Sequence, residues 1–148
     1  MKLFLISFSS LLLFVNACCS KPALDKDSMI TIIETNCWLN LMPGGEPSFH
    51  YSGVFAVKRE FYDQINFTAV KVYYKDEIIH QSKPILQLYD DNINDTTSLV
   101  RLNFYSEQGI KVTEKMMTAE SADFHFIFHI GNDIVEKHLN DIPITRAY

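Results

Sequence analysis

Apolar and polar residues alternate along most of the chain after residue 28. The alternation is clearest at 99–105, where Val100, Leu102 and Phe104 share one face, and at 124–130, where phenylalanines alternate with polar residues. A period of two places successive side chains on opposite faces of a strand. The same pattern predicts strands over 29–41, 49–59, 65–80 and 84–89.

Turn signals separate the predicted strands. Pro43-Gly44 suits the centre of a type II turn, because proline fixes φ and glycine accepts a positive φ. The 65–80 segment carries a polar break at Lys75-Asp76-Glu77 and is expected to be one long strand or a strand pair. The residues after Ile130 predict a hairpin that turns at either Gly131-Asn132 or Asn132-Asp133. Its second strand is expected over 134–139, with Asp141-Ile142-Pro143 ending it.

The number and spacing of these segments predict an all-β domain. We expect about seven or eight strands in an antiparallel β-sandwich of immunoglobulin-like or fibronectin-like architecture. A small β-barrel or a jelly roll is the alternative. Adjacent Ile32-Ile33 suggests a bulge or a strand break, and only 113–120 is expected to form one or two helical turns.

The first residues follow a different pattern. Lys2 precedes an apolar run from Leu3 to Val15, which is followed by Ala17 and Cys18. This run is shorter than the roughly 20 residues of a membrane-spanning helix, and its layout is typical of a secretory signal peptide. We predict a signal peptide over 1–17, a modified N-terminus and tether over 18–28, and a single domain over 29–148.

The tetrapeptide Val15-Asn16-Ala17-Cys18 resembles the lipobox of bacterial lipoproteins, with an aliphatic residue three positions before the cysteine and a small residue directly before it. In that family a diacylglyceryl group alkylates the thiol, a peptidase cuts before the cysteine, and the new amino terminus is acylated. The resemblance implies a lipidated Cys18 that inserts into the lipid bilayer, and a cell-envelope location facing the periplasm or the surface. Secretion is the alternative, because an ordinary signal-peptidase site also accepts Val15 and Ala17.

Composition supports a globular domain and limits its partners. Hydrophobic residues make up 47% of the 148 residues, which is ample for a core. The net charge of −5, without a cluster of lysines or arginines, argues against nucleic acid as a partner and against electrostatic docking to anionic lipids. If Cys18 carries lipid, Cys19 and Cys37 remain, and whether they pair stays open.

One candidate partner patch surrounds the Pro43-Gly44 turn. Aromatic residues beside a glycine-containing loop are common at recognition surfaces, and they would fit an unknown protein or a carbohydrate. The same residues could instead close one end of the core. The candidate patch consists of Trp38, Met42, Phe49, His50 and Tyr51.

Histidines near the C-terminus provide weak candidates for a metal site. On one strand, His125 and His129 would lie about 13 Å apart, too far to share an ion. A Gly131-Asn132 turn would place His125 opposite His138, whereas an Asn132-Asp133 turn would place His129 opposite Glu136. Either pair could bind a copper or zinc ion, but such residues also occur on any solvated sheet face.

Motifs of catalysis are absent from the sequence. It contains no GxSxG elbow, no HExxH helix and no glycine-rich phosphate loop. We therefore predict a non-catalytic interaction module without a cofactor, anchored to the membrane of the cell envelope. A metal-binding envelope protein and a small envelope enzyme are the alternatives.

Overall fold

The computed structural model describes residues 28–89, 98–107 and 110–148, and strands dominate them. The predicted signal peptide, the predicted lipid attachment at Cys18 and most of the predicted tether lie outside the described residues. A short helix, α1 (Glu114–Thr118), and a 3-10 helix, η2 (Arg59–Gln64), accompany the strands. The strands are β1 (Ile30–Asn40), β2 (Ser48–Lys58), β3 (Ile65–Tyr74), β4 (Glu77–Ser82), β5 (Ile85–Leu88), β6 (Leu99–Tyr105), β7 (Ile110–Lys111), β8 (Ser121–Ile130) and β9 (Asp133–Ala147).

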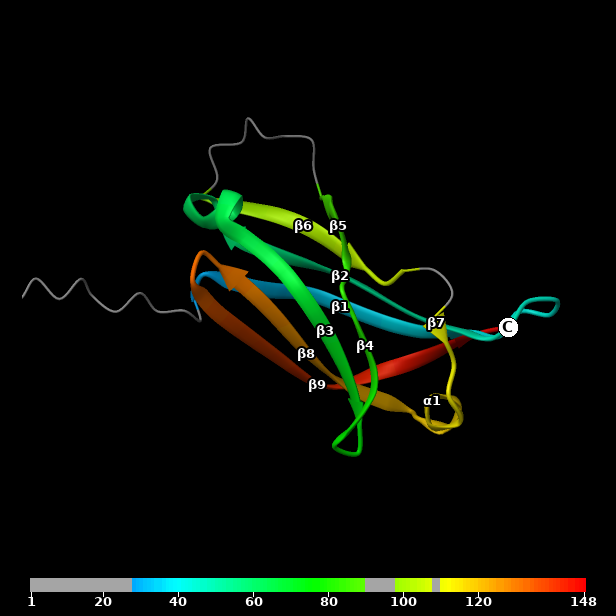
Figure 1. The fold of residues 1–148 in the computed structure, drawn as a ribbon. Coiled ribbons are helices and arrows are strands. Elements are labelled where there is room, and N and C mark those ends of the chain that lie inside the picture. The colour runs from blue at the N-terminus through cyan, green and yellow to red at the C-terminus, as the bar shows by residue number, and fades with distance from the viewer. Residues whose placement is uncertain (1–27, 90–97, 108–109) are drawn as a thin grey trace, which may run out of the picture.

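These strands form one curled sheet, in the order β4-β3-β8-β9-β1-β2-β6-β5, with β7 paired to β2. All pairs are antiparallel except β1 with β9. The sheet curls so that its β3–β8 part faces its β2–β6 part (Figure 1). The all-β prediction is confirmed. The arrangement is a half-barrel rather than two clearly separate sheets, so the immunoglobulin-like architecture stays a prediction.

Strand β9 joins the two parts of the sheet. Its first half continues the antiparallel hairpin with β8, and its second half runs parallel to β1, with Cys37 opposite Ile144. The transition lies beside Asp141, whose φ of 57° breaks the regular strand. The Asp141 backbone N–H donates to the Asp123 carboxylate at 2.8 Å, which stabilises this conformation. The strand therefore extends well beyond the segment 134–139 that the sequence predicts.

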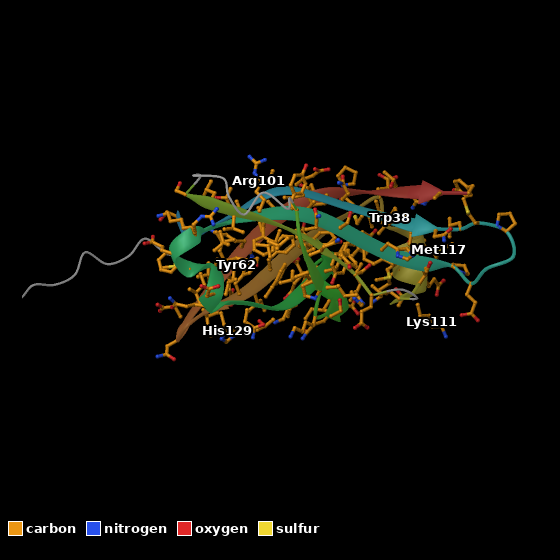
Figure 2. All side chains as sticks on the ribbon, turned by 90° about the horizontal axis from the view of Figure 1, so that it is seen from above. Trp38, Tyr62, Arg101, Lys111, Met117 and His129 are labelled. Atoms are coloured by element: carbon orange, nitrogen blue, oxygen red, sulfur yellow. The ribbon has the colours of Figure 1, made fainter. Side chains whose placement is uncertain are left out.

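Side chains fill the space inside the curl, as Figure 2 shows, and phenylalanines are the largest group among the fully buried ones. Phe67 stacks on Phe128 with ring centroids 4.1 Å apart, and Phe55 meets Phe67 edge-on at 5.6 Å. Phe104 contacts Phe126 across the two parts of the sheet at 5.5 Å. Burying each ring stabilises the fold by about 1.5–3 kcal/mol. The rings of both parts thus form one continuous core.

The predicted bulge in the first strand is present. The register between β1 and β2 shifts between Ile32 and Glu34, which leaves Ile33 as an extra residue that is 51% exposed. Gly53 accommodates the resulting close approach. A Cβ on Gly53 would lie 2.2 Å from the Glu34 carbonyl oxygen and 2.4 Å from Cζ of Phe104. Only glycine fits at this position without displacing its neighbours.

The turns explain how the hairpins close. Gly44 has a φ of 91°, as the Pro43-Gly44 turn requires. Lys75 and Asp76, both at positive φ, separate β3 from β4, so the 65–80 segment is a strand pair. The last hairpin turns at Gly131-Asn132, because Ile130 pairs with Asp133. The 3-10 helix η2 was not predicted.

Helix α1 lies within the segment expected to be helical. The Thr113 side chain accepts a hydrogen bond from the Met116 backbone N–H and caps the N-terminus, while the Met116 side chain is fully buried. At the other end, the Arg146 guanidinium donates to the carbonyl oxygens of Met117 and Ala119 at 3.1 and 2.9 Å. Among the described residues, no helix has the length and apolar character that crossing a membrane requires.

Candidate functional site

Strand alternation divides the predicted partner patch between two faces. Phe49 and Tyr51 point into the core and are 0% exposed, so their placement in a surface patch is corrected. Trp38 and His50 lie on the outer face of β1 and β2 and are half-buried. Met42, in the loop after β1, is 57% exposed. The part of the patch that a partner can reach therefore consists of Trp38, Met42 and His50.

Trp38 and His50 form a flat cross-strand pair. They occupy opposite positions of the β1–β2 ladder, and their rings stack with centroids 5.3 Å apart and planes 13° apart. His50 Nε2 also shares a hydrogen bond of 2.8 Å with the Ser48 hydroxyl, which fixes the imidazole orientation. Figure 2 places Trp38 and Met117 toward the same end of the molecule, away from His129. The stack is a rigid aromatic surface at that end.

Tyr51 belongs to a polar network at the core's edge. Its hydroxyl shares a hydrogen bond of 2.7 Å with the Ser82 hydroxyl, which in turn contacts His80 Nε2 at 2.9 Å. Burial raises the pKa of Tyr51 and lowers the pKa of His80. Both groups are therefore held in their neutral forms, as expected when hydrogen bonds satisfy polar groups inside a core.

Two serine–histidine pairs exist, Ser48 with His50 and Ser82 with His80, but neither forms a catalytic triad. Such a triad needs a carboxylate on the second imidazole nitrogen, which orients the ring and stabilises its charged form. In the part of the chain that the structure describes, no carboxylate hydrogen-bonds either histidine. In each pair, the hydrogen bond fixes how the hydroxyl and the imidazole are oriented.

A shallow cleft of about 360 Å³ crosses the outer face of β1, β2, β6 and β5. Its less polar lining consists of Gly53, Val54 and Phe104. Sequence reasoning missed this cleft, although strand alternation already directs Asn36 and Asn103 away from the core. The polar lining consists of Glu34, Asn36, Ser52, Gln87, Asn103 and Tyr105.

Strand register arranges the polar lining in two rows. In one row Asn36 pairs with Ser52, and Ser52 pairs with Tyr105. In the other row Glu34 leads through Val54 to Asn103 and then to Gln87. Asn36 Nδ2 donates to the Glu34 carboxylate at 2.7 Å. The cleft thus combines amides, a hydroxyl and an aromatic ring on one preformed surface.

The His125–His138 pair occurs as the Gly131-Asn132 turn predicts. The two rings are 3.9 Å apart between centroids, and the Tyr73 ring lies 4.3 Å from His125. The pKa of His125 is lowered, mainly by burial and secondly by the nearby His138. Glu136 carries an oxygen 3.6 Å from His138 Nε2.

The other metal candidate does not form a pair, because His129 lies opposite Ile134 and not opposite Glu136. Within the described residues, no group of three or more histidine, cysteine, aspartate or glutamate side chains is arranged to hold a metal ion. His125 and His138 therefore provide a pair of nitrogen donors and not a closed coordination sphere.

Cys37 is a buried free thiol in the described residues. Burial raises its pKa to about 12, and its Sγ–H donates to the Pro143 carbonyl oxygen at 3.4 Å. A thiol with so high a pKa is unreactive at neutral pH, because the thiolate is the nucleophilic form. Cys37 therefore acts as a packing residue between β1 and β9. Its predicted possible partner, Cys19, lies outside the described residues.

Comparisons of the chain with protein-family models, with curated proteins and with solved structures found no match.

Proposed function

We propose that this chain is a membrane-anchored lipoprotein of the cell envelope whose β domain is a non-catalytic binding module. The N-terminal pattern ending at Cys18 supports the anchor and the location, which is periplasmic or surface-facing. Several acyl chains, each methylene contributing about 0.8 kcal/mol, would hold the protein firmly in the bilayer. An immunoglobulin-like or fibronectin-like sandwich remains the finer fold that we propose for the domain.

The observation that carries the binding role is the outer face of β1, β2, β6 and β5. On this face the Trp38–His50 stack and the polar cleft lie next to each other, since Asn36 and Trp38 follow at alternate positions of β1. Binding surfaces combine an aromatic group with convergent polar groups on a rigid scaffold. In the described part of the chain, neither serine–histidine pair has a carboxylate hydrogen-bonded to its imidazole, which favours binding over catalysis.

The anchor is tested by the mass of the mature protein from its native host. We expect a chain that begins at Cys18 and carries two or three acyl groups. A Cys18→Ala variant should leave the membrane fraction or remain uncleaved. A mature chain with an unmodified Cys18 would refute the anchor and favour secretion.

The binding face is tested by site-specific photo-crosslinking in native cells. A photoreactive amino acid at Met42, beside the Trp38–His50 stack, should yield a discrete crosslinked species. The matched control is Ile134 on β9, which is also exposed but lies away from this face. Equal crosslinking from both positions would contradict a binding role for the outer face of β1 and β2.

A second candidate function is copper or zinc binding, favoured by the 3.9 Å approach of the His125 and His138 rings. Titration of the protein with Cu²⁺ or Zn²⁺ should then release heat at one site, and His125→Ala should abolish it. His129→Ala is the matched control, because His129 is on the same strand outside the pair. The absence of a metal-dependent signal would eliminate this candidate.

A further inference from the structure

We propose that the cleft across β1, β2, β6 and β5 binds a neutral carbohydrate. This inference rests on the proposed binding role and specifies the chemical class of the ligand. The cleft volume of about 360 Å³ falls within the range of small-ligand sites, which begins at about 300 Å³. Its open shape on a sheet face suits a ligand that lies along the surface.

The charge of the lining determines which ligands fit. Among the described residues, no lysine or arginine lines the cleft, and the one carboxylate in its lining is Glu34, which already accepts a hydrogen bond from Asn36. Without a cationic side chain, the cleft cannot form the charge-assisted hydrogen bonds that bind phosphate and carboxylate groups most strongly, so anionic ligands are disfavoured. The net charge of −5 of the whole chain acts in the same direction. A neutral ligand is therefore favoured.

The hydrogen-bonding groups point to a ligand with many hydroxyl groups. Side-chain amides donate and accept at once, as does a serine hydroxyl, and this duality matches a sugar hydroxyl. In the described part of the chain, the side chains of Ser52, Gln87 and Asn103 form no hydrogen bond with protein groups. Their donors and acceptors are available to a ligand.

The apolar groups complete the match. A sugar ring has a polar rim of hydroxyls and two less polar faces of C–H groups. In the cleft, Tyr105, which is 37% exposed, lies with the amides in the lining, and Val54 adds an apolar side chain. An aromatic side chain with a polar tip can contact both kinds of surface.

The scaffold holds these groups in place before a ligand arrives. Asn36, Ser52 and Tyr105 stand on three adjacent hydrogen-bonded strands, β1, β2 and β6. Preorganisation on strands reduces the entropy lost on binding. Weak individual hydrogen bonds can therefore add to a measurable affinity.

The test is calorimetric titration of the full chain, purified in detergent, with chitotetraose, cellotetraose and maltotetraose. We expect at least one tetrasaccharide to bind and to change the emission of Trp38, the sole tryptophan of the chain and a neighbour of Asn36 on β1. Inorganic phosphate should not bind. Binding of none of the three sugars, or binding of phosphate in their place, would overturn the inference.

Variants locate the site. Asn103→Ala and Gln87→Ala should each weaken binding about threefold to tenfold, as the loss of one hydrogen bond predicts. Tyr105→Ala should weaken it about tenfold. Asn66→Ala, which removes an exposed amide from β3, is the matched control and should bind like the wild type. Circular dichroism and the melting temperature establish that each variant is folded. If the folded cleft variants bind the sugar with unchanged affinity, the sugar binds elsewhere on the protein.

The two proposals fail separately. Crosslinking of a protein from Met42 without any sugar binding would retain the binding module and reject its carbohydrate ligand. Failure of both experiments would reject the binding module itself.

Discussion

Gly53 is the residue on which the close packing of β1, β2 and β6 depends. Its missing side chain allows the Glu34 carbonyl oxygen and the Phe104 ring to approach the β2 backbone. The same residues border the cleft, so the bulge in β1 shapes the surface as well as the core. The sequence shows an alternating strand around Gly53 but gives no sign of this contact.

Replacing Gly53 with alanine should destabilise the protein by about 3 kcal/mol, at the upper end of the cost of overpacking. The cause is the 2.2 Å separation between the added Cβ and a backbone oxygen that cannot move alone. Gly45→Ala is the matched control, because no atom lies within 4 Å of its Cβ position. Urea denaturation measures both, and equal effects of the two variants would contradict this role.

His80 should make the stability of the protein depend on pH. Burial lowers its pKa in the folded state, so the unfolded chain binds more protons below the ordinary histidine pKa of about 6.5. Stability is then full above pH 6.5 and falls as the pH drops below it. Between pH 7 and 5.5, His80→Gln should flatten the plot of unfolding free energy against pH, whereas Gln81→Asn should leave it unchanged. An unaltered slope in His80→Gln would show that His80 is not responsible.

At the level of residues, the sequence predicted strand faces better than it predicted exposure. Alternation already grouped Phe49 and Tyr51 with Phe55 on one face of a strand. The partner patch combined that face with Trp38 and His50, because the sequence does not reveal which face meets the core. Which face of a strand is buried depends on the other strands of the sheet. Those strands are distant in the sequence, so the local pattern does not specify how they pair.

At the level of elements, the β8–β9 hairpin shows how one turn sets the position of every side chain. The sequence allowed two turns, and they place His125 or His129 in different pairs. Gly131 has a φ of 57°, which favours the Gly131-Asn132 turn and brings His125 opposite His138. The sequence therefore identified two possible turns, and the strand register in the structure shows which of them forms.

Substitution of Gly131 tests this turn. Gly131→Val should destabilise the protein by about 1–2 kcal/mol, because a branched side chain disfavours positive φ. Gly131→Asn should cost less, since asparagine tolerates this conformation and no atom lies closer than 3.5 Å to the Cβ position. Thermal denaturation compares the two. A larger loss in Gly131→Asn would contradict the conformational explanation.

Strand β9 illustrates what the pattern does not predict. The sequence predicts that the strand ends before Asp141-Ile142-Pro143, yet β9 continues to Ala147. Asp141 introduces an irregularity and not a stop, since its N–H bonds to the Asp123 carboxylate. Tertiary pairing with β1 overrides the local signals.

At the level of the whole molecule, one aromatic core connects both parts of the curled sheet. We expect a single cooperative unfolding transition as a result. Denaturation followed by Trp38 emission, which reports on β1, should coincide with denaturation followed by circular dichroism of all strands. Phe126→Ala should lower the free energy of unfolding by about 3–5 kcal/mol, and by the same amount with both probes. Separate midpoints for the two probes would show that the parts unfold independently.

The parallel contact between β1 and β9 has a consequence for the order in which the chain is made. Cys37 and Pro143, which contact each other across this junction, are 106 residues apart. A ribosome that adds about 5–20 residues per second releases the first strand seconds before the last one. During that interval one edge of β1 lacks its partner, and an unpaired edge readily adds strands of other chains. The newborn chain therefore exposes this edge of β1 until β9 has been synthesised.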